Sequence, residues 1–165
     1  MPNTIIRDQS FEIAELDAPF NFSRRPIDIP GDLRPVWRIG LLVLLLKNCC
    51  RQNRARFTQL HVLNWGIRSD DTRRCLEEAI SGSIGVESLI VRIEPSLNRA
   101  VDLAIGERLV RRCSGDQVEL TQQGLDFASE IENDALMYRP ERDFMARIRK
   151  KVTATFVDGL FNKGV

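Results

Sequence analysis

The sequence predicts a mainly α-helical fold with a small β-hairpin wing, and three consecutive stretches carry this prediction. Residues 95–106 place their apolar side chains at the spacing of one helical face. Residues 109–120 contain two short strand-like runs around a glycine-containing turn, which is typical of a β-hairpin. Residues 121–131 begin with Thr121, a favourable helix N-cap, and continue with a second apolar stripe. A helix, a hairpin and a closing helix in this order predict a winged helix-turn-helix.

The chain divides into three parts on this interpretation. Residues 1–33 have no sustained helical period and contain a segment with proline at both ends, which predicts an extended N-terminal arm. Residues 34–135 form the predicted winged-helix domain, and residues 136–165 form a C-terminal amphipathic helix. With 165 residues, the chain can bury most of its apolar surface without disulfide bonds.

Two helices are predicted at the start of the winged-helix domain. The first begins near Pro35 and ends at about Cys50, and we expect it to be buried on several sides because its middle is apolar nearly all the way round. Residues 51–56 are polar and basic and predict a loop. Residues 57–67 then return to helical spacing and predict the second helix.

A third helix and a short strand separate the second helix from residues 95–106. Ser69 is a good N-cap for this third helix, and Gly82 is a good stop signal. Residues 89–93 are rich in β-branched side chains and predict a short strand. In a tight helix-turn-helix the second and recognition helices are almost adjacent, so this insertion departs from the simple DNA-reading pattern.

The predicted C-terminal helix has an apolar face and a basic face. Phe144, Ile148, Val152 and Phe156 follow one another at i+4 spacing, while the opposite face carries arginines and lysines. Such a stripe either packs on the protein's own core or receives a partner. We expect self-packing, because two exposed phenylalanines would favour aggregation.

The composition argues against several kinds of site. The four cysteines form no C-x-x-C pair and His61 is the single histidine, so suitably spaced zinc ligands are too few. We expect the adjacent Cys49 and Cys50 to fill core space as free thiols. The sequence contains no glycine-rich phosphate loop, nucleophile elbow or metalloprotease motif. It therefore predicts a non-enzymatic protein with no catalytic residues, no metal and no cofactor.

Two observations bear on location. The apolar run over residues 39–46 is far shorter than the ~20 residues that a membrane helix requires. The N-terminus has no basic start followed by an apolar stretch and a small-residue cleavage site. We expect a cytoplasmic protein that does not enter a membrane.

Three short strings give the chain a resemblance to a known family. They are residues 33–39 (LRPVWRI, followed by a leucine run), 59–65 (QLHVLNW) and 120–124 (LTQQG). Over roughly residues 30–135 the chain resembles the middle-component proteins of bacterial ABC-three component systems. In that family, a small winged-helix protein is encoded between an SMC-like ABC ATPase and an effector, and is thought to join them in defence against phage or other invading DNA.

The resemblance implies a non-enzymatic adaptor that couples the ATPase to the effector. Trp37 and Trp65 are the candidate partner-binding residues, because interface energy concentrates in large aromatic side chains; core packing is the competing explanation for both. Trp65 and Val62 share a flank of their helix that could serve as a contact surface. The ABC ATPase, the effector or both are the expected partners, and a homodimer remains open.

The alternative is a DNA-binding winged-helix transcriptional regulator. Its recognition helix would be residues 95–106, which offer only one cation, and phosphate contacts normally supply half or more of the hydrogen bonds to DNA. The basic loop and the wing could still give weak, salt-sensitive, non-specific binding to duplex DNA. The candidate nucleic-acid-binding residues are Arg51, Arg54, Arg56, Arg99, Arg111 and Arg112.

Overall fold

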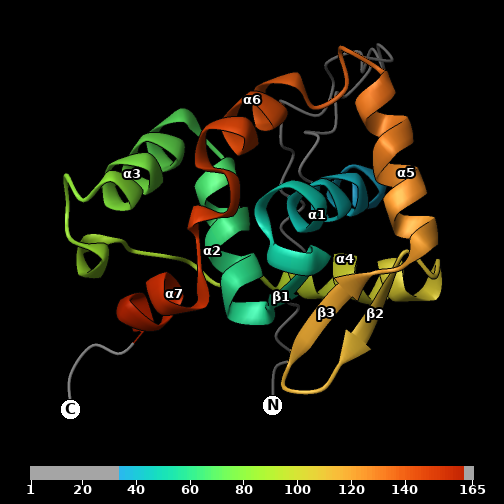
Figure 1. Ribbon diagram of the computed structural model, residues 1–165, viewed down its shortest axis with the longest axis horizontal. Helices are drawn as coiled ribbons and strands as arrows, with labels where there is room; N and C mark the ends of the chain where they lie inside the picture. The colour runs from blue at the N-terminus through green and yellow to red at the C-terminus, as the bar shows by residue number, and fades with distance from the viewer. Residues whose placement is uncertain (1–33, 162–165) are drawn as a thin grey trace, which may run out of the picture.

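The computed structural model describes residues 34–161, which form helices around a small antiparallel sheet (Figure 1). The predicted N-terminal arm over residues 1–33 and the last four residues lie outside the described part. The described helices and strands are, in chain order, α1 (Pro35–Cys49), η3 (Arg51–Asn53), β1 (Arg54–Arg56), α2 (Phe57–Ile67), α3 (Asp70–Ser81), η4 (Val86–Ser88), α4 (Pro95–Gly106), β2 (Val110–Cys113), β3 (Gln117–Leu120), α5 (Gln122–Asn133), α6 (Arg139–Ile148), η5 (Arg149–Lys151) and α7 (Ala154–Phe161). The prediction of a mainly helical fold with a small β-hairpin is confirmed.

Helix α1 lies at the centre of the fold, with α2, α4, α5 and α6 packed around it (Figure 1). Pro35 occupies its first turn, where the missing N–H costs no hydrogen bond. Every residue from 40 to 46 is buried, because no charge interrupts this apolar run, and the prediction of burial on several sides is confirmed. Near the other end, the Lys47 ammonium lies 2.7 Å from the Glu132 carboxylate and joins α1 to α5.

The sheet has the strand order β1-β3-β2, with β3 in the middle. The β2–β3 hairpin confirms the prediction for residues 109–120. Strand β1 corrects the prediction that residues 51–56 form a loop, because the turn η3 is followed by three residues paired with β3. Three residues are too few to show a period of two, and the pairing depends on a strand far later in the chain.

The segment between η4 and α4 is irregular. Residues 89–93, predicted as a strand, have neither helical nor strand structure, so that prediction is wrong. Leu89 is buried, whereas Ile90 and Ile93 are 78% and 61% exposed. A strand needs a neighbour to satisfy its backbone N–H and C=O groups, and the three described strands pair only with one another.

The C-terminal part is two short helices instead of one. Helix α6 ends at Ile148, and Arg149 has φ 46° and ψ −137°, which no helix can continue. This break lets α6 pack against α1 and α3, while α7 packs against α2 and η4. Phe144, Ile148 and Val152 are buried and Phe156 is partly buried against the same core, so the prediction of self-packing is confirmed.

Helix α5 begins as the sequence predicts, and its opening explains the LTQQG string. The Thr121 hydroxyl accepts a hydrogen bond from the Gly124 N–H at 3.1 Å and lies 2.6 Å from the Arg108 carbonyl. A Cβ on Gly124 would lie 2.0 Å from the Leu109 carbonyl oxygen. The LTQQG string therefore determines how the start of α5 packs against residues 108 and 109. This structural role explains the string, and no role in DNA binding is needed to explain it.

Candidate partner-binding cleft and basic residues

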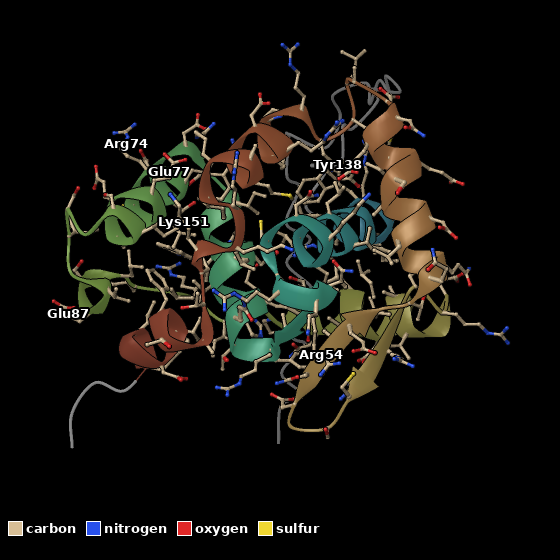
Figure 2. All side chains as sticks on the ribbon, in the orientation of Figure 1. Arg54, Arg74, Glu77, Glu87, Tyr138 and Lys151 are labelled. Atoms are coloured by element: carbon tan, nitrogen blue, oxygen red, sulfur yellow. The ribbon has the colours of Figure 1, made fainter. Side chains whose placement is uncertain are left out.

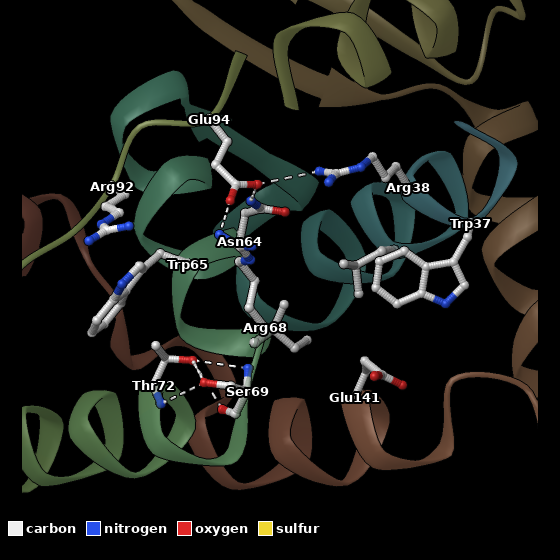
Figure 3. Close-up of a pocket in the computed structure, with 12 residues that line it drawn as sticks. Trp37, Arg38, Asn64, Trp65, Arg68, Ser69, Thr72, Arg92, Glu94 and Glu141 are labelled. Atoms are coloured by element: carbon white, nitrogen blue, oxygen red, sulfur yellow. Dashed lines mark hydrogen bonds and ion pairs between the residues drawn. The ribbon is translucent and has the colours of Figure 1, made fainter. Parts of the chain in front are cut away.

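A cleft of about 540 Å³ lies between α1, α2 and the segment before α4 (Figure 3). Trp37 on α1 and Trp65 on α2, which the sequence singled out separately, both line it. Figure 3 shows the two rings at opposite ends of the cleft, with Arg68 and Glu94 between them. Both tryptophans are partly exposed, so each presents part of its ring to solvent while the rest packs against the core.

Trp37 is held in place by Tyr138, which precedes α6. The two rings stack with their centroids 5.6 Å apart, and the Tyr138 hydroxyl donates a 2.8 Å hydrogen bond to the Trp37 carbonyl. Burial raises the pKa of Tyr138 to about 12, so the phenol remains a donor at neutral pH. A Cβ on Gly40 would lie 2.3 Å from the tyrosine oxygen, so glycine is needed there for this contact.

Glu94 is the centre of a charge cluster between the tryptophans (Figure 3). Its carboxylate forms ion pairs with Arg38, at 3.4 Å, and with Arg68, and it accepts a 3.3 Å hydrogen bond from the Asn64 side chain. The side chains of Glu94 and Arg38 are only 15% and 13% exposed. The cluster joins α1, α2 and the start of α4, and gives the cleft both signs of charge beside its aromatic ends.

Sequence reasoning missed the charged part of this cleft. Arg38, Arg68 and Glu94 are not among the candidate site residues that the sequence indicates. No local pattern links these three residues, because their contact depends on how α1 and α2 pack. The expectation that Val62 shares an exposed flank with Trp65 is also wrong, since Val62 is fully buried.

Two of the candidate nucleic-acid-binding arginines share one acid. Arg54 on β1 and Arg111 on β2 both lie opposite Glu119 on β3, and both form ion pairs with its carboxylate. The hydrogen bond from Arg111 is the main cause that lowers the pKa of Glu119, and Arg54 and Cys113 lower it further against the effect of burial. These arginines hold the sheet together across its three strands.

Two more candidate arginines also have partners within the protein. Arg112 lies 2.9 Å from Asp102 on α4, and its guanidinium lies 5.5 Å from the centre of the Phe57 ring. Arg56 lies 3.4 Å from Asp158 on α7. These pairs are exposed, so each is worth ~1 kcal/mol at most, but they offset the charge that a phosphate would meet.

Arg51 and Arg99 complete the six candidates. Both are exposed, and neither forms an ion pair with an acid among residues 34–161. Arg99 lies on α4 and Arg51 lies in η3, so neither belongs to the β2–β3 hairpin that carries Arg111 and Arg112. The six candidates therefore come from four elements: η3, β1, α4 and β2.

The described cysteines and the histidine form no metal-binding group, and the buried thiols stay protonated. Cys49 and Cys50 are buried free thiols, which confirms the expectation that they fill the core, and burial raises the pKa of Cys50 to about 12. Among residues 34–161, no group of three or more His, Cys, Asp or Glu side chains could hold a metal ion. None of the described helices is both long enough and apolar enough to span a lipid bilayer.

Comparisons with protein-family models, with curated proteins and with solved structures gave no match to this chain.

Proposed function

We propose that this protein is a non-enzymatic adaptor that binds a larger protein through the cleft between Trp37 and Trp65. The observation that carries the proposal is that two tryptophans from separate helices border one open cleft. Interface energy concentrates in large aromatic side chains, and these two flank a charge cluster in which Arg38 and Glu94 are mostly buried. The mixed charges of Arg38, Arg68 and Glu94 would select a partner segment with both polar and apolar groups.

We also propose that the fold is a winged helix with an insertion. In support, α1, β1 and α2 are followed by α4 and a hairpin, and β1 pairs with the second strand of that hairpin. Helix α3 and the irregular segment after it would be the insertion. On this interpretation α4 occupies the recognition-helix position.

The identity of the partners rests on the sequence resemblance. Middle-component proteins of ABC-three component systems are encoded beside an SMC-like ABC ATPase and an effector, and we propose that this chain couples such a pair in the bacterial cytoplasm. The ATPase and the effector are therefore the first proteins to test against the cleft.

A DNA-binding regulator is the second candidate function. Arg99 and the exposed wing favour it, but Arg54, Arg56, Arg111 and Arg112 already have acidic partners within the protein. We expect at most weak, sequence-independent binding that disappears as salt is raised. Sequence-selective binding of the isolated protein in a mobility-shift series across salt concentrations would favour the regulator.

Co-purification tests the adaptor. Trp37→Ala and Trp65→Ala should each lose the proteins encoded by neighbouring genes while the melting temperature shows that the variant is folded. Phe127→Ala is the matched control, because this aromatic side chain is also partly buried but lies on α5 outside the cleft. Retention of the partners by both folded tryptophan variants would reject the cleft as the binding surface.

A further inference from the structure

A second, smaller cleft lies on another part of the surface, where the turn after α1 meets the turn before α7. Its volume is about 240 Å³, below the ~300–1,000 Å³ of pockets that enclose a drug-sized ligand, so it suits one small chemical group. Its polar lining consists of three cations and three neutral hydrogen-bonding side chains, with no carboxylate: Arg51, Arg54, Lys150, Gln59, Thr153 and Thr155.

The cations of this cleft are only partly neutralised within the described part of the chain. Arg51 and Lys150 are exposed and form no ion pair with an acid among residues 34–161. Arg54 does pair with Glu119, but that single carboxylate also serves Arg111. The lining therefore has an excess of positive charge that a bound anion would offset.

The backbone brings these cations together at a conformational cost. Gln52 and Asn53, beside Arg51, have φ of 53° and 56°, and Arg149, beside Lys150, has φ 46°. Positive φ at residues other than glycine is uncommon and costs conformational energy where the surroundings impose it. Two such turns, about a hundred residues apart in sequence, place arginine and lysine side chains around one cleft.

We propose that this cleft binds the phosphate group of a small molecule. Arginine offers a planar fork of donors to phosphate oxygens, lysine adds a compact positive charge, and the threonine hydroxyls can complete the set of donors. A small phosphate ester fits better than a nucleic acid, because Arg56 and Arg112, which could otherwise contact further phosphates along a backbone, are paired with Asp158 and Asp102. The proposal is independent of the adaptor function.

The test is calorimetric titration of the whole protein with inorganic pyrophosphate at low salt, followed by a short DNA duplex. We expect saturable, one-to-one binding of pyrophosphate, and Arg51→Gln and Lys150→Gln should each weaken it about tenfold, as loss of a charge-assisted hydrogen bond would. Both residues are exposed, so the melting temperature without ligand should stay unchanged.

Two substitutions of exposed cations outside this cleft are matched controls (Figure 2). Lys151→Gln removes the adjacent lysine and Arg74→Gln removes an arginine on α3, and both should leave the affinity unchanged. Absence of saturable pyrophosphate binding, or equal losses in the controls, would overturn the site. A duplex that binds more than about tenfold tighter than pyrophosphate, with a steep salt dependence, would overturn the small-molecule ligand in favour of nucleic acid.

Discussion

His61 is buried on α2, and its surroundings favour the neutral imidazole. Its Nδ1 accepts a hydrogen bond from the Glu94 N–H at 3.5 Å, which requires that nitrogen to be unprotonated. Burial lowers the pKa of His61, against smaller effects of Asn98 and Glu94 that raise it. The histidine is thus a structural residue, and it makes stability depend on pH.

We expect the protein to lose stability as the pH falls below about 6.5, the ordinary histidine pKa. The unfolded chain then binds a proton that the folded protein resists, so the contribution of a neutral His61 is fully present above pH 6.5 and is lost towards its lowered pKa. Melting temperatures between pH 7.5 and 5.5 should therefore fall more steeply for the natural protein than for His61→Gln. Since the chain has one histidine, parallel curves would contradict this assignment.

Gly124 gives a second prediction at a single residue. Gly124→Ala would place a methyl group against the Leu109 carbonyl, which is backbone and cannot rotate away, so we expect a loss of about 1–3 kcal/mol in the free energy of unfolding. Gly159→Ala is the control, because nothing lies within 4 Å of its Cβ position in α7, and alanine there should stabilise by about 0.5–1 kcal/mol. Denaturant titration measures both, and equal effects of the two changes would argue against the close approach.

Among the helices, α6 and α7 contribute unequally to the core. Phe144 on α6 is fully buried, with the guanidinium groups of Arg73 and Arg147 at 6.0 and 5.8 Å from its ring centre. We expect Phe144→Ala to cost ~3–5 kcal/mol, because it leaves a cavity and removes both cation contacts. Phe156 on α7 is only partly buried, so Phe156→Ala should cost clearly less in the same denaturant titration. A larger loss at Phe156 would mean that α7 carries more of the core than its burial indicates.

Most helices are predictable from the sequence because local signals define both of their ends. Ser69 caps α3 together with Thr72, and Gly82 ends it in a left-handed conformation, as expected from these residue types. Three predictions are wrong: a loop where β1 forms, a strand at residues 89–93, and a single helix across Ile148. In each case, contacts with residues distant in sequence determine the backbone conformation. Arg149 has a positive φ, which the presence of an arginine does not predict.

The candidate site was predictable only in part, for the same reason. Trp37 and Trp65 were predicted as partner-binding residues only because they are large and aromatic. That they line one cleft could not be predicted, because it depends on how α1 and α2 pack. The arginines of β1 and of the β2–β3 hairpin looked available for phosphate, because the register that places Arg54 and Arg111 opposite Glu119 cannot be deduced from short strands.

For the whole molecule, α1 makes the C-terminal helices part of the core. The sequence pattern divides the chain into a domain over residues 34–135 and a C-terminal part. In the structure, however, α6 packs on α1, and Tyr138 fills the space beside Gly40. We expect a chain shortened to residues 34–135 to lose cooperative unfolding and to bind a hydrophobic dye, because it would uncover the surface that Phe144 and Ile148 bury. Thermal unfolding followed by near-UV circular dichroism measures this. A sharp transition close to that of the full chain would establish 34–135 as an independent domain.

The central place of α1 also has a consequence for synthesis on the ribosome. Helix α1 is the first described element to be translated, but α6, which covers part of it, ends at Ile148, about a hundred residues later. At ~5–20 residues per second, its leucine-rich surface waits roughly 5–20 s for that covering. The nascent chain therefore passes through an aggregation-prone interval, and chaperone supply and translation speed should influence the yield of soluble protein even where the finished fold is stable.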